Sequence, residues 1–283
     1  MLDSTYAQYS LPNINMKDKV ILITGGSSGI GRALAESFGK RGAKIVITGR
    51  NIQTLNETVD ALKKNNIEIS AIVADASIEA DAVKMVNETV RRYGGIDVLV
   101  NNAGITMRAI LEDVDLNVIR QVMNINFWGC VYASKYALPY ILKNKGSVVG
   151  ISSIAGKRGL PGRTGYSASK FAMEGFLESL RTEVLHQGVH VLTACPGFTT
   201  SNIRNSALSK DGKVQGESPR DEEKMMTSEE VAEAIYKAVV KRKRDLVLTS
   251  QGIMTVFMNK WLPGMMDKIV YNVMKKEKDS PLK

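Results

Sequence analysis

Short apolar segments recur along the chain, and a longer amphipathic segment separates each of them from the next. The apolar segments are rich in Val and Ile and contain few polar residues, which is typical of parallel β-strands covered by helices on both faces. They are residues 20–23, 44–48, 67–73, 96–100, 147–151, 189–194 and 245–248. The alternation predicts an α/β fold with a parallel sheet of seven strands.

The intervening segments carry helical patterns. The longest cover residues 115–142 and 164–186, and residues 227–241 open with Thr-Ser-Glu-Glu, which is typical of a helix N-terminus. Helices between successive parallel strands predict a Rossmann-type doubly wound sheet with helices on both faces. A length of 283 residues suits one large domain. We expect an N-terminal extension over residues 1–16, this domain over 17–250 and a tail over 251–283.

The composition is that of an ordinary soluble protein, with 44% hydrophobic and 24% charged residues. Cys130 and Cys195 belong to no C-x-x-C or Cys/His pattern, so we expect neither a disulfide framework nor a metal site. Residues 1–16 lack the features of a signal peptide. These observations favour a reducing, cytoplasmic environment.

The positive charge is concentrated near the end of the chain. The formal net charge is +9, and residues 237–283 contain eleven Lys and Arg against four Asp and Glu, a net +7. A nucleic-acid-binding surface would combine basic residues with stacking aromatic residues or a known reader motif, and the sequence contains neither. We therefore expect no nucleic-acid partner.

One long segment has neither a strand nor a helix pattern. Residues 199–226 are polar, contain Gly and Pro, and have no apolar periodicity. Compact domains use loops of this length as lids or binding loops. We expect this segment to cover a substrate.

A glycine-rich turn directly follows the first predicted strand and precedes a helical pattern. The turn reads Thr24-Gly25-Gly26-Ser27-Ser28-Gly29-Ile30-Gly31. Glycines allow the backbone to approach a pyrophosphate, and the helix N-terminus presents free amides to it. We therefore expect a bound dinucleotide to contact Gly25, Ser27, Ser28, Gly29, Ile30 and Gly31.

The second predicted strand ends at Gly49-Arg50-Asn51. Enzymes that use NAD usually place an acidic residue here to bind the ribose 2′-hydroxyl, whereas a basic residue accommodates a 2′-phosphate. Gly49 occupies the position of the acid, and the Arg50 guanidinium suits phosphate. The pattern predicts NADP(H), with Arg50 and Asn51 at its ribose.

Asp75 and Ala76 follow the third predicted strand. A carboxylate at this position can accept a hydrogen bond from the adenine amino group, and we assign both residues to the cofactor site. The alternative is that Asp75 caps the helix that begins near Ser77.

Tyr166 and Lys170 stand four residues apart in a helical pattern, so their side chains project from the same face. A Lys cation about 4 Å away would stabilise a phenolate by roughly 4 kcal/mol at an effective dielectric constant of 20. That interaction would lower the Tyr pKa from about 10 toward neutrality. The pair suits proton transfer, although the same spacing is common in surface pairs.

Further motifs follow the apolar segments in a fixed order. Together with the glycine-rich turn they are Asn101-Asn102-Ala103-Gly104, Asn126, Ser153, Tyr166, Lys170 and Pro196-Gly197. In this order and spacing, the chain resembles the short-chain dehydrogenases/reductases over about residues 17–248. The family resemblance implies hydride transfer between a nicotinamide cofactor and a carbonyl or alcohol.

The resemblance also implies catalytic roles. Tyr166 would donate a proton to the carbonyl as hydride arrives, and Ser153, rather than its neighbour Ser152, would hold the carbonyl oxygen. Lys170 would lower the pKa of Tyr166 and bind the nicotinamide ribose. Asn126 would support a water that links Lys170 to solvent.

Several cofactor contacts are implied in the same way. Asn102, Ala103 and Gly104 would line the adenine side, and Pro196, Gly197 and Thr199 would contact the nicotinamide. The family often has Thr where this chain has Ser201, and Ser can make the same hydrogen bond. Many NADP(H) enzymes have a basic residue where this chain has Ser28, so Arg50 is expected to provide most of the 2′-phosphate recognition.

The resulting hypothesis is an NADPH-dependent carbonyl reductase that acts on a hydrophobic or lipid-like small molecule and assembles as a homodimer or homotetramer. A 3-oxoacyl thioester reductase is an alternative within the same chemistry. A catalytically idle NADP(H)-binding scaffold is an alternative of another class.

The tail contains apolar residues at helical spacing after Pro263, with more apolar residues before it. They are Phe257, Met258, Trp261, Met265, Met266, Ile269, Val270, Val273 and Met274. Charged residues and the Pro263-Gly264 pair exclude a single membrane-spanning helix. This face could pack on the core or on a partner subunit. Alternatively it makes peripheral contact with an anionic membrane through flanking residues Lys260, Lys268, Lys275, Lys276 and Lys278.

Overall fold

The structure is a computed structural model that describes residues 15–200, 203–204, 206–216 and 225–282. Seven strands form a single sheet in the order β3-β2-β1-β4-β5-β6-β7, and every neighbouring pair is parallel. The strands are β1 (Val20–Ile23), β2 (Lys44–Gly49), β3 (Ile69–Val73), β4 (Val98–Asn101), β5 (Ser147–Ile151), β6 (His190–Cys195) and β7 (Asp245–Val247). The predicted doubly wound, seven-stranded sheet is confirmed.

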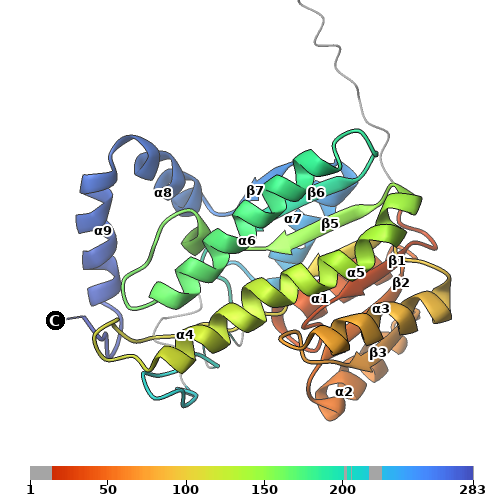
Figure 1. The fold of residues 1–283 in the computed structure, drawn as a ribbon, viewed down its shortest axis with the longest axis horizontal. Helices are drawn as coiled ribbons and strands as arrows, with labels where there is room; N and C mark the ends of the chain where they lie inside the picture. The colour runs from red at the N-terminus through yellow and green to blue at the C-terminus, as the bar shows by residue number, and fades with distance from the viewer. Residues whose placement is uncertain (1–14, 201–202, 205, 217–224, 283) are drawn as a thin grey trace, which may run out of the picture.

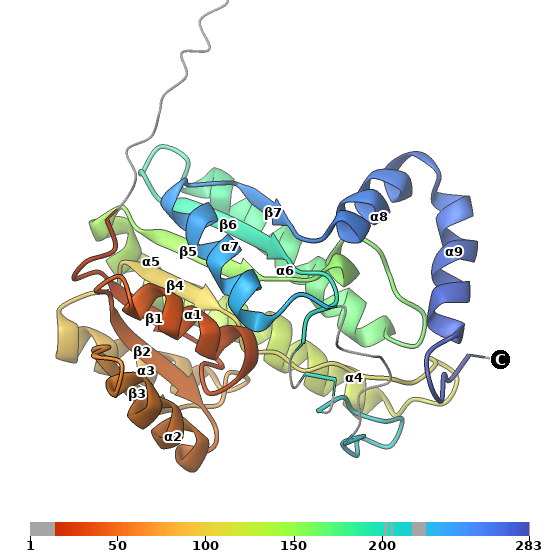
Figure 2. The same cartoon turned by 180° about the vertical axis from the view of Figure 1, so that it is seen from behind.

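Helices cover both faces of this sheet (Figures 1 and 2). The helices on one face are α1 (Gly29–Gly39), α2 (Ile52–Lys63) and α7 (Ser228–Val240). Those on the other face are α3 (Glu79–Tyr93), α5 (Gly129–Asn144) and α6 (Thr164–Glu183). Successive residues of a strand enter opposite cores: Ile21 and Ile23 pack with α1 and α7, whereas Leu22 packs with α3 and α5. This arrangement explains why both faces of each strand are apolar.

The segment expected as one helix over residues 115–142 consists of three parts. α4 (Leu116–Met123) continues through a π-helical segment, Asn124–Trp128, into α5. A π-helical turn widens the backbone locally and is frequent at functional sites. Periodicity alone gave a uniform helix, because the chain keeps its helical direction through the wider turn.

The described residues of the long segment after β6 form isolated bridges. Thr199 pairs with Met226, and Leu208 pairs with Met107 in the loop that follows β4. Leu208 is buried with Met107 and Val118 in a small apolar cluster. The described part of this segment is therefore tied to the edge of the sheet at which the strands end.

The chain after β7 forms two helices, α8 (Ser250–Trp261) and α9 (Pro263–Lys275). Figures 1 and 2 show them as an arm that extends beyond the end of the sheet. Within the part of the chain that the structure describes, no helix has the length and apolar character needed to cross a membrane.

The sheet reverses its chain order between β1 and β4, since β1 leads to β2 on one side while β4 lies on the other. In doubly wound folds, ligands bind at the carboxyl ends of the strands at this switch point. The loops after β1, β4 and β5 meet there.

Candidate active site

The glycine-rich turn connects β1 to α1 in a conformation that requires glycine at defined positions. Gly25 has a φ of 65° and Gly29 a φ of 50°, both in the left-handed region. A Cβ at Gly31 would lie 2.3 Å from the Gly25 carbonyl oxygen and 2.5 Å from Asn102 Nδ2. In the described structure, the Ser28 side chain makes no capping hydrogen bond to α1. The first amides of α1 are thus available to an anion.

Asn102 fixes this turn to the end of β4. Its Nδ2 donates to the carbonyl oxygens of Thr24 (3.0 Å) and Gly25 (2.9 Å). The backbone amides of Asn102 and Ala103 both donate to Thr24 Oγ1 at 3.0 Å. The sequence predicted that Asn102 lines the adenine side, and the structure adds that its amide holds the phosphate-binding turn in place.

Gly49 ends β2 and Arg50 follows it, where the sequence predicts the cofactor ribose. Arg50 is exposed and lines the cavity. Asn51, which the sequence also predicts at the cofactor, is not among the described residues that line the cavity. Its Oδ1 instead accepts from the amides of Gln53 (2.8 Å) and Thr54 (3.3 Å), so that Asn51 caps α2.

Asp75 lies at the cavity wall after β3. Its Oδ1 accepts from the backbone amide of Ser77 (2.9 Å) and from Ser77 Oγ (2.7 Å), whereas the N-cap residue of α3 is Ile78. Asp75 therefore stabilises the turn before α3 without being the N-cap of that helix. It also lines the cavity in which adenine binding is predicted.

Asn126 is fully buried in the π-helical segment and braces the loop after β4. Its Oδ1 accepts from the Ile105 amide (2.8 Å), and its Nδ2 donates to the Ile105 carbonyl and to Ser169 Oγ, both at 2.9 Å. A Cβ at Gly104 would lie 3.2 Å from Asn126 Oδ1 and 3.5 Å from Lys170 Nζ. Asn126 and Lys170 thus meet at Gly104, and Asn126 also couples this loop to α6.

Lys170 is buried, with 3% of its surface exposed, and its Nζ donates to the Ile151 carbonyl at 2.8 Å. Burial lowers its pKa to about 8, and Cys130, Cys195 and Glu174 oppose that decrease. Lys170 Nζ lies 5.8 Å from the centre of the Tyr166 ring. The predicted placement of both side chains on one face of a helix is confirmed.

Groups other than Lys170, which was predicted to lower it, set the pKa of Tyr166. Burial raises the pKa of Tyr166 above its usual value, while the hydrogen bond with Ser153 and the charge of Arg163 lower it. Arg163 stands at the N-cap of α6 and lines the cavity. Nothing in the local sequence marks Arg163 as a site residue, because an arginine before a helix is usually solvated.

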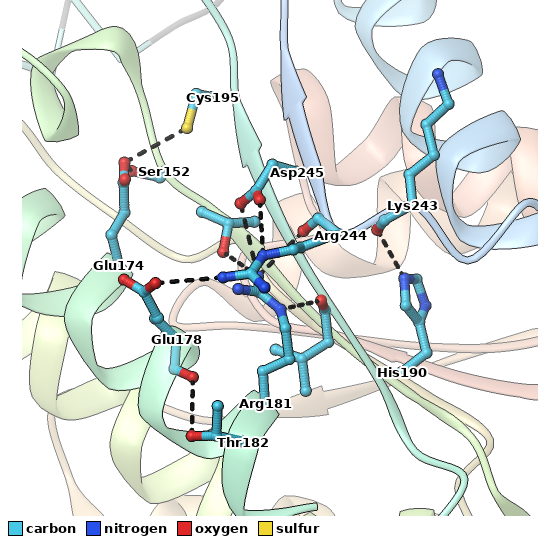
Figure 3. A network of polar contacts seen from close by, with 12 residues as sticks. Ser152, Glu174, Glu178, Arg181, Thr182, His190, Cys195, Lys243, Arg244 and Asp245 are labelled. Atoms are coloured by element: carbon cyan, nitrogen blue, oxygen red, sulfur yellow. Dashed lines mark hydrogen bonds and ion pairs between the residues drawn. The ribbon is translucent and has the colours of Figure 1, made fainter. Parts of the chain in front are cut away.

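The neighbouring serines, Ser152 and Ser153, face different partners. Ser152 Oγ donates to Glu174 Oε1 at 2.5 Å, and Cys195 Sγ donates to the same oxygen at 3.4 Å (Figure 3). Glu174 also forms an ion pair with Lys157 at 2.6 Å. Ser153, in contrast, hydrogen-bonds Tyr166. The geometry agrees with the choice of Ser153.

One cavity of about 360 Å³ joins these groups at the carboxyl ends of the strands. It is lined by the glycine-rich turn and also by apolar and basic side chains that include Leu160, Phe198, Ile203 and Arg204. Of the other predicted site residues, Gly31 and Asn126 support the cavity from behind, and Ser201 lies outside the described residues. The remaining predicted residues line it: Gly25, Ser27, Ser28, Gly29, Ile30, Arg50, Asp75, Ala76, Asn102, Ala103, Gly104, Ser153, Tyr166, Lys170, Pro196, Gly197 and Thr199.

Residues 19–212 match the short chain dehydrogenase family model. The chain belongs to the short-chain dehydrogenase/reductase family. It is 34% identical over 274 residues to the mouse "Dehydrogenase/reductase SDR family member 7B", covering 94% of this chain and 84% of the relative. It is 37% identical over 224 residues to "11-beta-hydroxysteroid dehydrogenase-like 4A" of Arabidopsis thaliana, covering 78% of this chain and 72% of the relative.

The fold is also similar to a solved structure. A short-chain dehydrogenase/reductase from Burkholderia phymatum, crystallised in complex with NAD, aligns with a TM-score of 0.80 at 23% identity and covers 89% of this chain and 96% of its own. Family membership makes this protein an oxidoreductase of carbonyl and alcohol groups that uses a nicotinamide cofactor. The site suits a dinucleotide. A side chain at position 31 would collide with Gly25 and Asn102, so the position requires glycine. The backbone of a glycine turn at a helix N-terminus can approach a pyrophosphate closely.

The depressed pKa of Lys170 has a consequence for stability. Between about pH 8 and pH 10.5 the unfolded chain binds a proton at this position that the folded protein does not, so the contribution of Lys170 to the free energy of unfolding rises with pH through this window, whereas the raised pKa values of Cys130 and Cys195 act in the opposite direction above about pH 9. We expect Lys170→Met to flatten that rise. The measurement is urea unfolding without nucleotide at about pH 7 and about pH 10.

The control is Lys64→Met on the exposed surface, which should keep the wild-type rise. Equal pH dependence in Lys170→Met and the wild type would show that Lys170 keeps its proton in the folded protein.

Proposed function

We propose that this enzyme reduces a ketone with NADPH and that Tyr166 is the general acid. The observation that supports the proposal most is that Ser153, Tyr166 and Lys170 line the same cavity as the phosphate-binding turn. A proton donor must lie within hydrogen-bond reach of the oxygen that it protonates. The side chains of Ser153 and Tyr166 are joined by a hydrogen bond. Together they can bind one carbonyl oxygen.

The chemistry assigns one step to each side chain. A nicotinamide cofactor held in this cavity would supply the hydride, and the carbonyl oxygen would take up a proton as its negative charge develops. Ser153 holds that oxygen, and the Tyr166 hydroxyl donates the proton and becomes a phenolate. The charge of Arg163 stabilises the phenolate. The alcohol oxidation is the same set of transfers reversed.

The preference for NADPH rests on the end of β2. Gly49 places no carboxylate there, and Arg50 is exposed at the cavity wall. A carboxylate at this position would bind a ribose hydroxyl and repel a phosphate, whereas guanidinium binds phosphate through paired hydrogen bonds.

The substrate we propose is hydrophobic or lipid-like. Leu160, Phe198 and Ile203 line the cavity beyond Tyr166, and a mainly apolar wall with a few polar groups is typical of small-molecule sites. The name of the Arabidopsis relative, a hydroxysteroid dehydrogenase-like protein, agrees with a substrate of this class. A panel of steroid ketones, long-chain ketones and 3-oxoacyl thioesters, assayed with NADPH, would identify the subclass.

We expect Tyr166→Phe to lower turnover by about 10²- to 10⁴-fold while NADPH binding stays near the wild-type value, because a positioned acid contributes to chemistry and little to cofactor affinity. The assays are steady-state turnover on the best ketone of the panel and a fluorescence titration with NADPH. Tyr93→Phe, which removes a hydroxyl that donates to Ser70 on β3, is the matched control and should retain activity. Equal turnover in Tyr166→Phe and the wild type would remove Tyr166 from the mechanism.

We expect the wild type to bind NADPH more tightly than NADH by about ten- to a hundredfold, since a hydrogen bond to a charged group contributes about 1.5–3 kcal/mol. Arg50→Ala should lose most of this difference, whereas Arg91→Ala, an exposed arginine at the end of α3, should keep it. Calorimetric titrations with both nucleotides measure the ratio. Equal affinities in the wild type would overturn the NADPH assignment, and NADPH binding without turnover of any ketone would indicate an idle scaffold.

A further inference from the structure

Besides Tyr271, the arm formed by α8 and α9 exposes seven large apolar side chains, each between 39% and 66% exposed. On α8 the exposed residues recur at helical spacing, and Leu262, Met265 and Ile269 continue the series along α9. The seven are Ile253, Met254, Phe257, Trp261, Leu262, Met265 and Ile269. Singly exposed apolar residues are ordinary, but seven on two consecutive helices indicate an interaction surface.

A different set of residues attaches the arm to the protein. Met266, Val270 and Met274 lie on another stripe of α9 and are buried with Leu160 and Leu282. This stripe packs on Leu160, in the loop after β5, and is separate from the two apolar clusters that cover the sheet. The residues of the outer stripe remain exposed.

Polar contacts at the base also fix the direction of the arm. Arg158 donates to Asn259 Oδ1 at 2.9 Å and pairs with Asp267, while Asn259 Nδ2 donates to the Lys157 carbonyl at 3.2 Å. These contacts come from the loop after β5, which also borders the cavity. The exposed apolar surface therefore has a defined orientation.

The charges around the apolar surface are nearly all positive. Between Ser250 and Lys276 the chain has four lysines, Lys260, Lys268, Lys275 and Lys276, all exposed, and one acid, Asp267, which is paired with Arg158. Lys260 Nζ lies 5.7 Å from the Trp261 ring, so its cation stays at the rim of the apolar surface. A surface with this rim is complementary to an apolar layer bordered by negative charge.

We propose that the α8–α9 arm docks on an anionic lipid bilayer, with the exposed apolar side chains at the boundary of the acyl chains and the lysines at the headgroups. A second copy of the chain is a poorer partner, because an isologous contact would bring the same lysines together. Leu160 lines the cavity and packs on α9. The docked surface would thus lie beside the substrate end of the site.

The test is sedimentation of the full chain with phosphatidylcholine vesicles with and without phosphatidylserine at low salt. We expect binding only when phosphatidylserine is present, and a loss of about tenfold or more in Phe257→Ser/Trp261→Ser and in Lys268→Glu/Lys275→Glu. The controls Ile78→Ser/Leu185→Ser and Lys64→Glu/Lys143→Glu change equally exposed residues elsewhere and should bind like the wild type.

Thermal unfolding of each variant verifies that it is folded. The proposal is overturned if the wild type does not sediment with the anionic vesicles, or if arm and control variants lose binding alike. It is also overturned if sedimentation velocity shows that Phe257→Ser/Trp261→Ser dissociates a dimer, since a second copy would then cover the arm.

A separate feature links the chain end to the catalytic groups. Glu277, after α9, accepts from Arg163 Nη2 at 3.2 and 2.9 Å and lies 3.7 Å from Arg108 Nε. The three side chains are only 3–10% exposed. Arg108 follows β4 and Arg163 precedes Tyr166, so one carboxylate joins the two loops that flank the cavity.

We infer that Glu277 is a positioning residue that acts on Tyr166 through Arg163, an inference that rests on the proposed function of Tyr166. Arg163, Lys170, Ser153 and Cys195 are the charged or titratable groups around the Tyr166 hydroxyl. Glu277 opposes the charge of Arg163 in a buried setting, where charges interact strongly. Removing its charge would make the phenolate easier to form.

Glu277→Gln keeps the size of the side chain and removes its charge. We expect the pH at which ketone reduction falls to move lower, because Tyr166 must be protonated to act as the acid, whereas Glu277→Asp should restore the wild-type profile. Glu229→Gln, on the surface of α7, is the control. An unchanged profile in Glu277→Gln, with Tyr166→Phe inactive, would overturn this inference alone. An active Tyr166→Phe would overturn the proposed function instead.

Discussion

The hydrogen bonds between Asn102 and the turn after β1 are the interaction on which the site depends. Asn102 Nδ2 binds two carbonyl oxygens of that turn, and Thr24 Oγ1 receives two amides from the β4 loop. They join the two strands at which the sheet reverses its order, where parallel strands would otherwise end in independent loops. The Gly25 carbonyl and the Asn102 amide fill the space beside Gly31, so a side chain at position 31 would displace one of them.

The catalytic groups lie on the other side of the same loop, in surroundings that favour their neutral forms. Burial raises the pKa of Tyr166 and lowers that of Lys170, and both shifts reflect the free energy needed to place a charge away from water. A phenolate is therefore an unfavourable state of the folded protein until a positive charge is nearby. The Lys170 ammonium donates a hydrogen bond to the Ile151 carbonyl. The cation that lowers the pKa of Tyr166 is Arg163.

Local patterns predicted the parts of the molecule that local physics determines. β-Branched apolar runs gave all seven strands, with β3 and β4 starting two residues later than expected, and the glycines gave the phosphate-binding turn. The π-helical segment around Asn126 leaves no mark on periodicity. Asn51 is ambiguous for another reason: an asparagine after a strand serves a helix cap and a ribose equally well, and only the fold decides.

Interactions between distant segments could not be found in this way. Arg163 and Glu277 are 114 positions apart, and each reads alone as a solvated charge. Their pairing exists because α8 and α9 turn back past the loop after β5, and that path depends on packing of Met266, Val270 and Met274. When a helix has apolar residues on more than one face, each face needs its own packing contact to be buried. Here the stripe toward Leu160 packs within the protein, and the outer stripe stays exposed on it.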